Sequence, residues 1–254
     1  ITGSASLPME LDYNSIDFGK KVLNKPVDII VRGLFNHMDF LTEYLSIADS
    51  LRGTVKIELS INGGWEQLVR NGKISLEDCR LYTSTLGDPI TKIDGKGTLK
   101  KNILNIDQLQ CIKSGNKLVD KNIFVNGSVD LTHFFNPNYD LLIAGENILF
   151  KSLTDEMEGD VNIDLNISGG DTVSILGTIS LNDLILFKEF TTSVSIGKKP
   201  ENEEGSLLYY DIDFPIKESI SLVNSQIDAK LNGELHYTKW GNNTADYSGE
   251  LFFT

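Results

Sequence analysis

The chain has 254 residues, 40% of them hydrophobic, which suits one large β-domain or two ordinary domains. Its formal net charge is −13, from 23 basic and 36 acidic side chains. Such a surface repels nucleic acid and anionic lipid headgroups, because phosphate contacts need Lys and Arg. We therefore expect no nucleic-acid partner, and solubility is the plain explanation of the charge.

Alternation of apolar and polar residues dominates the chain and predicts strands with one buried face. It is clearest over 27–35, 123–131 and 227–237. Turn signals spaced by about 8–12 residues favour an antiparallel meander. The further predicted strands are 5–12, 91–100, 102–111, 140–150, 184–197, 206–214 and 246–254.

Residues 38–47 break the alternation and predict a short amphipathic helix. A weaker helical pattern lies at 151–158. Trp65 and Trp240 follow predicted strands, where each is either a rim residue or an ordinary, partly buried aromatic.

The segments 51–81 and 157–186 carry the same pattern, which indicates an internal repeat. Apolar positions and glycines persist, whereas the residues between them are polar in both copies. The match slips by one residue after the paired glycines and then resumes. The first copy has Gly53, Val55, Ile57, Leu59, Ile61, Gly63, Gly64 and Gly72, and the second has Gly159, Val161, Ile163, Leu165, Ile167, Gly169, Gly170 and Gly177.

The two cysteines, Cys79 and Cys111, lack the spacing of a zinc or redox site and are too few for a disulfide scaffold. One bridge in an oxidising compartment and two buried thiols both remain open.

Residues that carry catalysis or bind metal form no recognisable group. The three histidines are scattered, and HExxH, GxSxG and a Cys/His cluster are absent. Tyr209, Tyr210, Asp211 and Asp213 are the group that best fits a glycan site, although packing explains a tyrosine pair on a strand. We expect a protein that is not an enzyme, with no metal and no cofactor.

Each predicted strand has one aliphatic face, and two outcomes are open. The faces meet in a closed sandwich, or the sheet curls and leaves an apolar trough for another molecule.

The order of these features resembles the TamB/AsmA-like superfamily, the bridge-like proteins of the Gram-negative envelope. Such chains repeat a short amphipathic helix followed by glycine-spaced strands. This sequence departs from the family pattern in having no proline between Gly64 and Gly72 or between Gly170 and Gly177. The membrane anchor and the outer-membrane portion of the family are also missing, so we expect a central fragment of a longer chain. The segments that carry the resemblance are 2–8, 38–45, 51–59, 72–81, 93–109 and 125–131.

The resemblance implies an all-β fold, an elongated, curled antiparallel sheet (a β-taco or β-groove) with an apolar concave face and one or two short helices. We expect residues 1–254 to form this single domain. The resemblance further implies a periplasmic segment, anchored in the inner membrane by a part of the protein outside this sequence. That segment would bind acyl chains and support phospholipid transport between the two membranes.

The expected partners are phospholipid acyl chains and the remaining segments of the same chain. An outer-membrane β-barrel protein is an open further partner, since the family is also linked to outer-membrane protein assembly. The alternative to a lipid-binding groove is a closed β-sandwich or solenoid that acts as a scaffold or as an adhesin-type binding module. The expected groove residues are Val55, Ile57, Leu59, Ile61, Ile74, Leu76, Val125, Val129, Val161, Ile163, Leu165, Ile167, Ile179 and Leu181.

Overall fold

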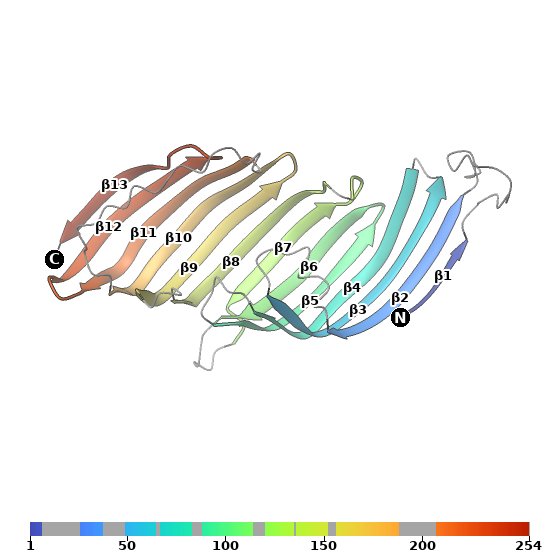
Figure 1. Cartoon of the computed structure of the whole chain (residues 1–254), viewed down its shortest axis with the longest axis horizontal. Coiled ribbons are helices and arrows are strands. Elements are labelled where there is room, and N and C mark those ends of the chain that lie inside the picture. The colour runs from blue at the N-terminus through green and yellow to red at the C-terminus, as the bar shows by residue number, and fades with distance from the viewer. Residues whose placement is uncertain are drawn as a thin grey trace.

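The computed structural model describes residues 1–6, 26–37, 49–64, 67–82, 88–113, 120–134, 136–151, 156–187 and 207–253. These residues form one curled, unclosed sheet of 13 strands, whose spatial order is the order of the sequence. Figure 1 shows the two ends of the sheet, blue β1 and red β13, far apart. The strands are β1 (Thr2–Ser6), β2 (Val27–His37), β3 (Ser50–Gly64), β4 (Gln67–Tyr82), β5 (Ile90–Lys100), β6 (Ile103–Ile112), β7 (Ile123–Asp130), β8 (Asn138–Lys151), β9 (Met157–Gly169), β10 (Thr172–Leu186), β11 (Leu207–Val223), β12 (Asp228–Trp240) and β13 (Asp246–Phe253).

The all-β, curled sheet that the resemblance implied is confirmed, and the structure adds that this sheet is unclosed. A closed sandwich is not what the described strands form, since they all belong to one sheet. The described residues contain no helix. The helix predicted at 38–47 lies outside the described residues. The one predicted at 151–158 is wrong at its two ends, where Lys151 ends β8 and Met157 begins β9.

One pairing departs from the predicted antiparallel meander. β10 and β11 run parallel, with Ile175 opposite Tyr210 and Gly177 opposite Ile212. All other neighbouring strands pair antiparallel, from β1–β2 to β12–β13. The predicted strand 184–197 is correspondingly wrong in its bounds, because β10 already contains residues 172–186 and residues 188–197 lie outside the described part. The predicted strand 5–12 is described only to Ser6, the last residue of β1.

The strand ends define two rims. We call one the Gly64 rim, because it contains the β3–β4 connection at Gly64 and Gln67. We call the opposite one the Tyr82 rim, where β4 ends opposite Ser50. Trp240 ends β12 on the Gly64 rim, where its ring centroid lies 5.4 Å from that of Tyr209 with the ring planes tilted by 52°, whereas Trp65 lies outside the described residues.

Bulges interrupt the ladder near the Tyr82 rim. Asp78 and Asp183 adopt positive φ angles of 47° and 41° there, as do Lys92 and Asn147 with 47° and 49°. The register shifts at the same places. Because a bulge bends its strand and increases the local twist, a line of bulges accounts for the curl of this half of the sheet.

The repeat found in the sequence is a repeated hairpin. In β3–β4, Ile57 lies opposite Ile74 and Leu59 opposite Gly72. In β9–β10, the equivalent pairs are Ile163 with Ile179 and Leu165 with Gly177. The one-residue slip therefore reflects a connection that is one residue shorter in the second hairpin.

Two buried clusters lie in the bulged half. The first contains Cys111, Ile123, Ile148 and Val161, and Val55 and Cys79 form the second. Both thiols are free and buried, which removes the disulfide alternative. Burial raises the pKa of the Cys79 thiol and raises that of Cys111 to about 11.

Candidate apolar trough

One face of the sheet is apolar across nearly its whole width. Laterally paired residues share a face, so rows of neighbours can be followed from strand to strand. One row, from β6 to β11, consists of Leu109, Val125, Ile143, Leu165, Gly177 and Ile212. A second, from β3 to β11, consists of Ile57, Ile74, Gly97, Ile106, Gly127, Leu141, Ile167, Ile175 and Tyr210.

All of the expected groove residues lie in phase on this apolar face. Val55 pairs with Leu76, and Val161 pairs with Leu181. Val129 lies in a third row with Leu104 and Tyr139. Some of these residues belong to the packed half of the face, where Val55 is 3% and Val161 8% exposed. The part of the apolar face that is open to solvent is therefore the half nearer the Gly64 rim.

Hollows lined by described residues open on the apolar face. The largest of them, of about 660 Å³, lies over β3–β6 and beside the residues that follow β7. Its lining residues are Ile57, Glu58, Leu59, Ile61, Arg70, Gly72, Lys73, Ile74, Leu99, Leu104, Leu131 and Phe134. A hollow of about 150 Å³ continues from it, sharing Ile74 and Leu104. A third, of about 450 Å³, lies over β10–β13 and is lined by Leu181, Tyr210, Ile212, Phe214, Ile216, Ile220, Leu235, Tyr237, Tyr247 and Leu251.

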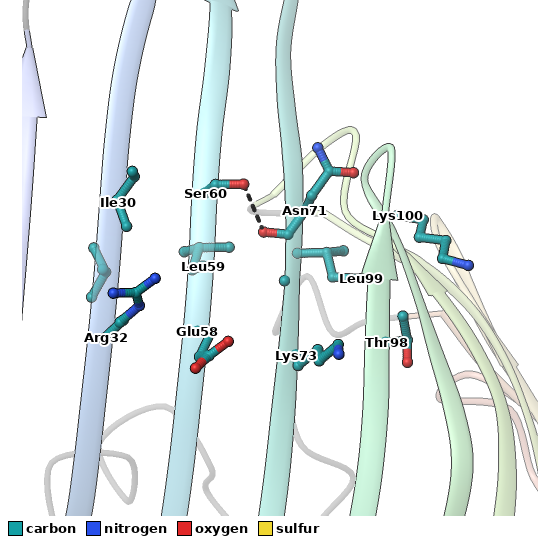
Figure 2. A pocket seen from close by; sticks show the side chains of 12 residues that line it. Ile30, Arg32, Glu58, Leu59, Ser60, Asn71, Lys73, Thr98, Leu99 and Lys100 are labelled. Atoms are coloured by element: carbon teal, nitrogen blue, oxygen red, sulfur yellow. Dashed lines mark hydrogen bonds between the residues drawn. The ribbon is translucent and has the colours of Figure 1, made fainter.

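The opposite face, which we call the polar face, carries charged and polar side chains together with exposed apolar ones such as Leu34 and Leu142. Lys56 donates to Glu77 across 2.6 Å, and Thr98 donates to Asp107 across 3.1 Å. A shallow depression of about 370 Å³ lies here over β2–β5 (Figure 2), where Ser60 Oγ donates to the carbonyl of Asn71. Its labelled side chains include Arg32, Glu58, Lys73 and Lys100 together with Ile30, Leu59 and Leu99, so charged and apolar groups are mixed there.

The tyrosine–aspartate group considered for a glycan site is divided between the two faces. Tyr209 donates to Asp211 across 3.0 Å on the polar face. His236 joins them, with Nδ1 at 2.7 Å from Asp213 and Nε2 at 3.5 Å from Asp211. Tyr210 instead lines the hollow over β10–β13. The sequence did not link His236 to this group, because the contact depends on the pairing of β11 with β12.

Two specific features are absent from the described residues. No group of three or more His, Cys, Asp and Glu side chains is arranged there to hold a metal ion. No described helix is long and apolar enough to cross a membrane.

Several wall residues were missed by the sequence analysis. Leu99, Leu104, Leu131 and Phe134 line the largest hollow, and Arg70 stands at its edge. Their alternation was visible, but Gly95 and Gly97 interrupt the aliphatic pattern of β5. The sequence could have singled out Arg70, because it is a charged residue in phase with the apolar Ile74 and Leu76.

No protein family model matches the chain, and the comparisons with curated proteins and with solved structures find no match either.

Proposed function

We propose that this chain is a non-catalytic segment of a bridge-like protein that holds acyl chains against the apolar face of its sheet. In this proposal it is periplasmic and supports phospholipid movement between the inner and outer membranes. The observation that carries the proposal is the apolar face itself, which continues across the unclosed sheet and opens in hollows of about 660 and 450 Å³. Apolar surface of this extent marks a binding site in a soluble protein.

Hydrophobic burial would hold an acyl chain firmly on this face and still let it slide along the sheet. Each buried methylene contributes about 0.8 kcal/mol, so a whole acyl chain in a dry trough is bound strongly. Along these rows, aliphatic side chains, interrupted by glycines such as Gly127 and Gly177, recur at the strand spacing of about 4.8 Å. A shift by one strand therefore restores similar contacts, for example from Ile143 to Leu165 in one row.

The polar face favours a second candidate function, a binding module for glycan or protein. The rings of Tyr209 and Trp240 contact each other there at a tilted angle, beside Asp211 and His236, and aromatic rings next to carboxylates suit sugar rings. Binding of soluble oligosaccharides, abolished by Trp240→Ala, would favour this candidate over the lipid conduit.

The test is to express the 254-residue chain in a Gram-negative periplasm, purify it gently, and identify bound lipid by native mass spectrometry and extraction. We expect bound phospholipid in the wild type and none in the double variant Ile57→Asp/Ile163→Asp. The matched control is Leu142→Asp, since Leu142 is 51% exposed on the polar face. Circular dichroism checks that each variant retains its sheet.

Leu131→Asp, at the edge of the largest hollow, serves as a second variant if the double variant does not fold. An apo wild-type protein, or equal loss of lipid in Leu142→Asp, would overturn the proposal.

A further inference from the structure

The charged side chains of the apolar face are few and lie on one rim. Outside the bulges, the described strand positions in phase with the apolar rows carry two charged residues, Arg70 and Lys239. Arg70 in β4 lies opposite Ile61 in β3, close to Gln67. Lys239 in β12 lies opposite Tyr210 in β11, beside Trp240. Both therefore lie near the Gly64 rim. The same in-phase positions carry no Asp or Glu, although the whole protein has a net charge of −13.

Arg70 is fixed at the edge of the largest hollow. Its Nη1 donates to the carbonyl oxygen of Leu131 at 3.1 Å, and its Cζ lies 5.7 Å from the ring centroid of Phe134. Its backbone N–H donates to Asn102 Oδ1 at 2.7 Å, and Asn102 in turn donates to the Leu68 carbonyl. Among the described residues, no carboxylate forms an ion pair with this guanidinium.

The surroundings of Arg70 separate a charged end from an apolar interior. Leu131 and Phe134 stand beside the guanidinium, and Ile57, Ile74 and Leu104 line the hollow beyond it. A guanidinium offers several N–H donors in a planar fork that matches phosphate oxygens. Its partial burial among apolar side chains strengthens its attraction for an anion, because the local dielectric is low.

We propose that Arg70 is a headgroup site, and that the hollow selects phospholipids with an anionic headgroup. The inference rests on the proposed function, since it assigns the headgroup of the lipid whose acyl chains occupy the trough. The phosphate lies at the Arg70 guanidinium on the Gly64 rim, and the chains extend over Ile57 and Ile74 toward the hollow that shares Leu104. Two contiguous apolar hollows suit a lipid with two chains. Lys239 supplies a cation at the same rim beside the third hollow.

The positive charge of Arg70 is the argument for an anionic headgroup, because the net charge of the whole protein is negative. A protein of net charge −13 repels anionic lipids at long range, so a preference for them requires a local cation. A zwitterionic headgroup brings its own cation to the phosphate and gains less from the guanidinium.

The experiment compares the binding of phosphatidylglycerol and phosphatidylcholine of identical chains to the delipidated protein. We expect the wild type to prefer phosphatidylglycerol roughly tenfold, which is the size of one charge-assisted hydrogen bond. Arg70→Gln should reduce the ratio to about one, and Arg70→Lys should leave an intermediate ratio. Arg32→Gln is the matched control, because Arg32 pairs with Glu58 on the polar face and should leave the ratio unchanged.

The outcomes separate this inference from the proposed function. Binding of neither lipid would overturn both. Binding of both lipids with equal affinity, or a preference that persists in Arg70→Gln, would overturn the headgroup site alone. If glycerol 1-phosphate competed as strongly as the lipid, Arg70 would be a plain anion site and the headgroup site would be overturned. A tenfold preference for a long-chain fatty acid would overturn the phospholipid assignment. If Arg70→Gln does not fold, an unchanged ratio in Arg70→Lys at both low and high salt would overturn it.

Discussion

A Cβ atom added to Gly53 would lie 2.4 Å from the Cα atom of Cys79. The relationship recurs in the second copy of the repeat, where a Cβ on Gly159 would lie 2.6 Å from the Cα of Leu184. Cys79 and Leu184 each follow a bulged aspartate and are 1% and 4% exposed. The glycine thus leaves the space that the bulged strand occupies with a buried residue, and this explains why both copies of the repeat have glycine at this position.

Replacing Gly53 by Ala should destabilise the sheet. Its φ of +133° is one that L side chains rarely adopt, and the added methyl would meet Cys79. We expect Gly53→Ala to lower the free energy of unfolding by about 2–4 kcal/mol, measured by urea denaturation. Gly64→Ala is the control, because nothing lies within 4 Å of its added Cβ, and it should change stability by less than about 0.5 kcal/mol. Equal effects at the two positions would contradict the packing argument.

The stability of the protein should fall in alkaline solution because of Cys111. Its pKa is raised from 9.0 to about 11 by burial, so the folded chain keeps a proton that the unfolded chain releases. Stability from this thiol is therefore intact below pH 9 and declines between pH 9 and 11, by roughly 2–3 kcal/mol in total. Cys111→Ala lowers stability at every pH but should lack this decline. Parallel pH profiles of the two proteins in urea would show that the thiol titrates normally.

Asn102 should stabilise the β5–β6 turn in two separable ways. It has a φ of 72°, and its side chain bonds the backbone of Arg70 and of Leu68. Asn102→Gly keeps the backbone conformation and loses the bonds, so we expect a loss of about 1–2 kcal/mol. Asn102→Ala adds the cost of positive φ and should lose about 1 kcal/mol more. A thermal or urea series in which alanine equals glycine would exclude the backbone contribution.

β13 should promote self-association of this 254-residue chain. Among the described residues it pairs only with β12, and Phe252 and Phe253 are 55% and 70% exposed. An unpaired apolar edge strand is a template for another strand. The double variant Phe252→Lys/Phe253→Lys should sediment as a smaller species at high concentration. Leu142→Lys removes an exposed leucine from the middle of the sheet, and the same shift in that variant would argue against the edge.

Period-two alternation predicted most of the strands because it reports a property that most strands here share, an apolar face on one side of the sheet. It could not predict the direction of pairing. β11 has the same alternation whether Tyr210 lies beside Ile175 in a parallel or an antiparallel ladder.

The groove residues were predicted as a face, and the structure divides that face into a packed and an open half. Val55 and Ile57 look alike in the sequence, yet Val55 belongs to a buried cluster and Ile57 lines a hollow. The difference arises from bulges at residues such as Asp78, whose positive φ follows from tertiary pairing and not from local pattern. Arg70 and His236 acquire their partners across strands, which no single-strand pattern contains.

The most direct test of the trough uses two adjacent leucines. Leu141 lies on the apolar face opposite Gly127 and Ile167, whereas Leu142 is 51% exposed on the polar face. A photoreactive benzoylphenylalanine is placed at either position, the protein is loaded with phospholipid and irradiated, and adducts are counted by mass spectrometry. Lipid adducts at position 141 and none at position 142 are the predicted result. Equal labelling at both positions, or labelling at 142 alone, would contradict an acyl-chain trough on this face.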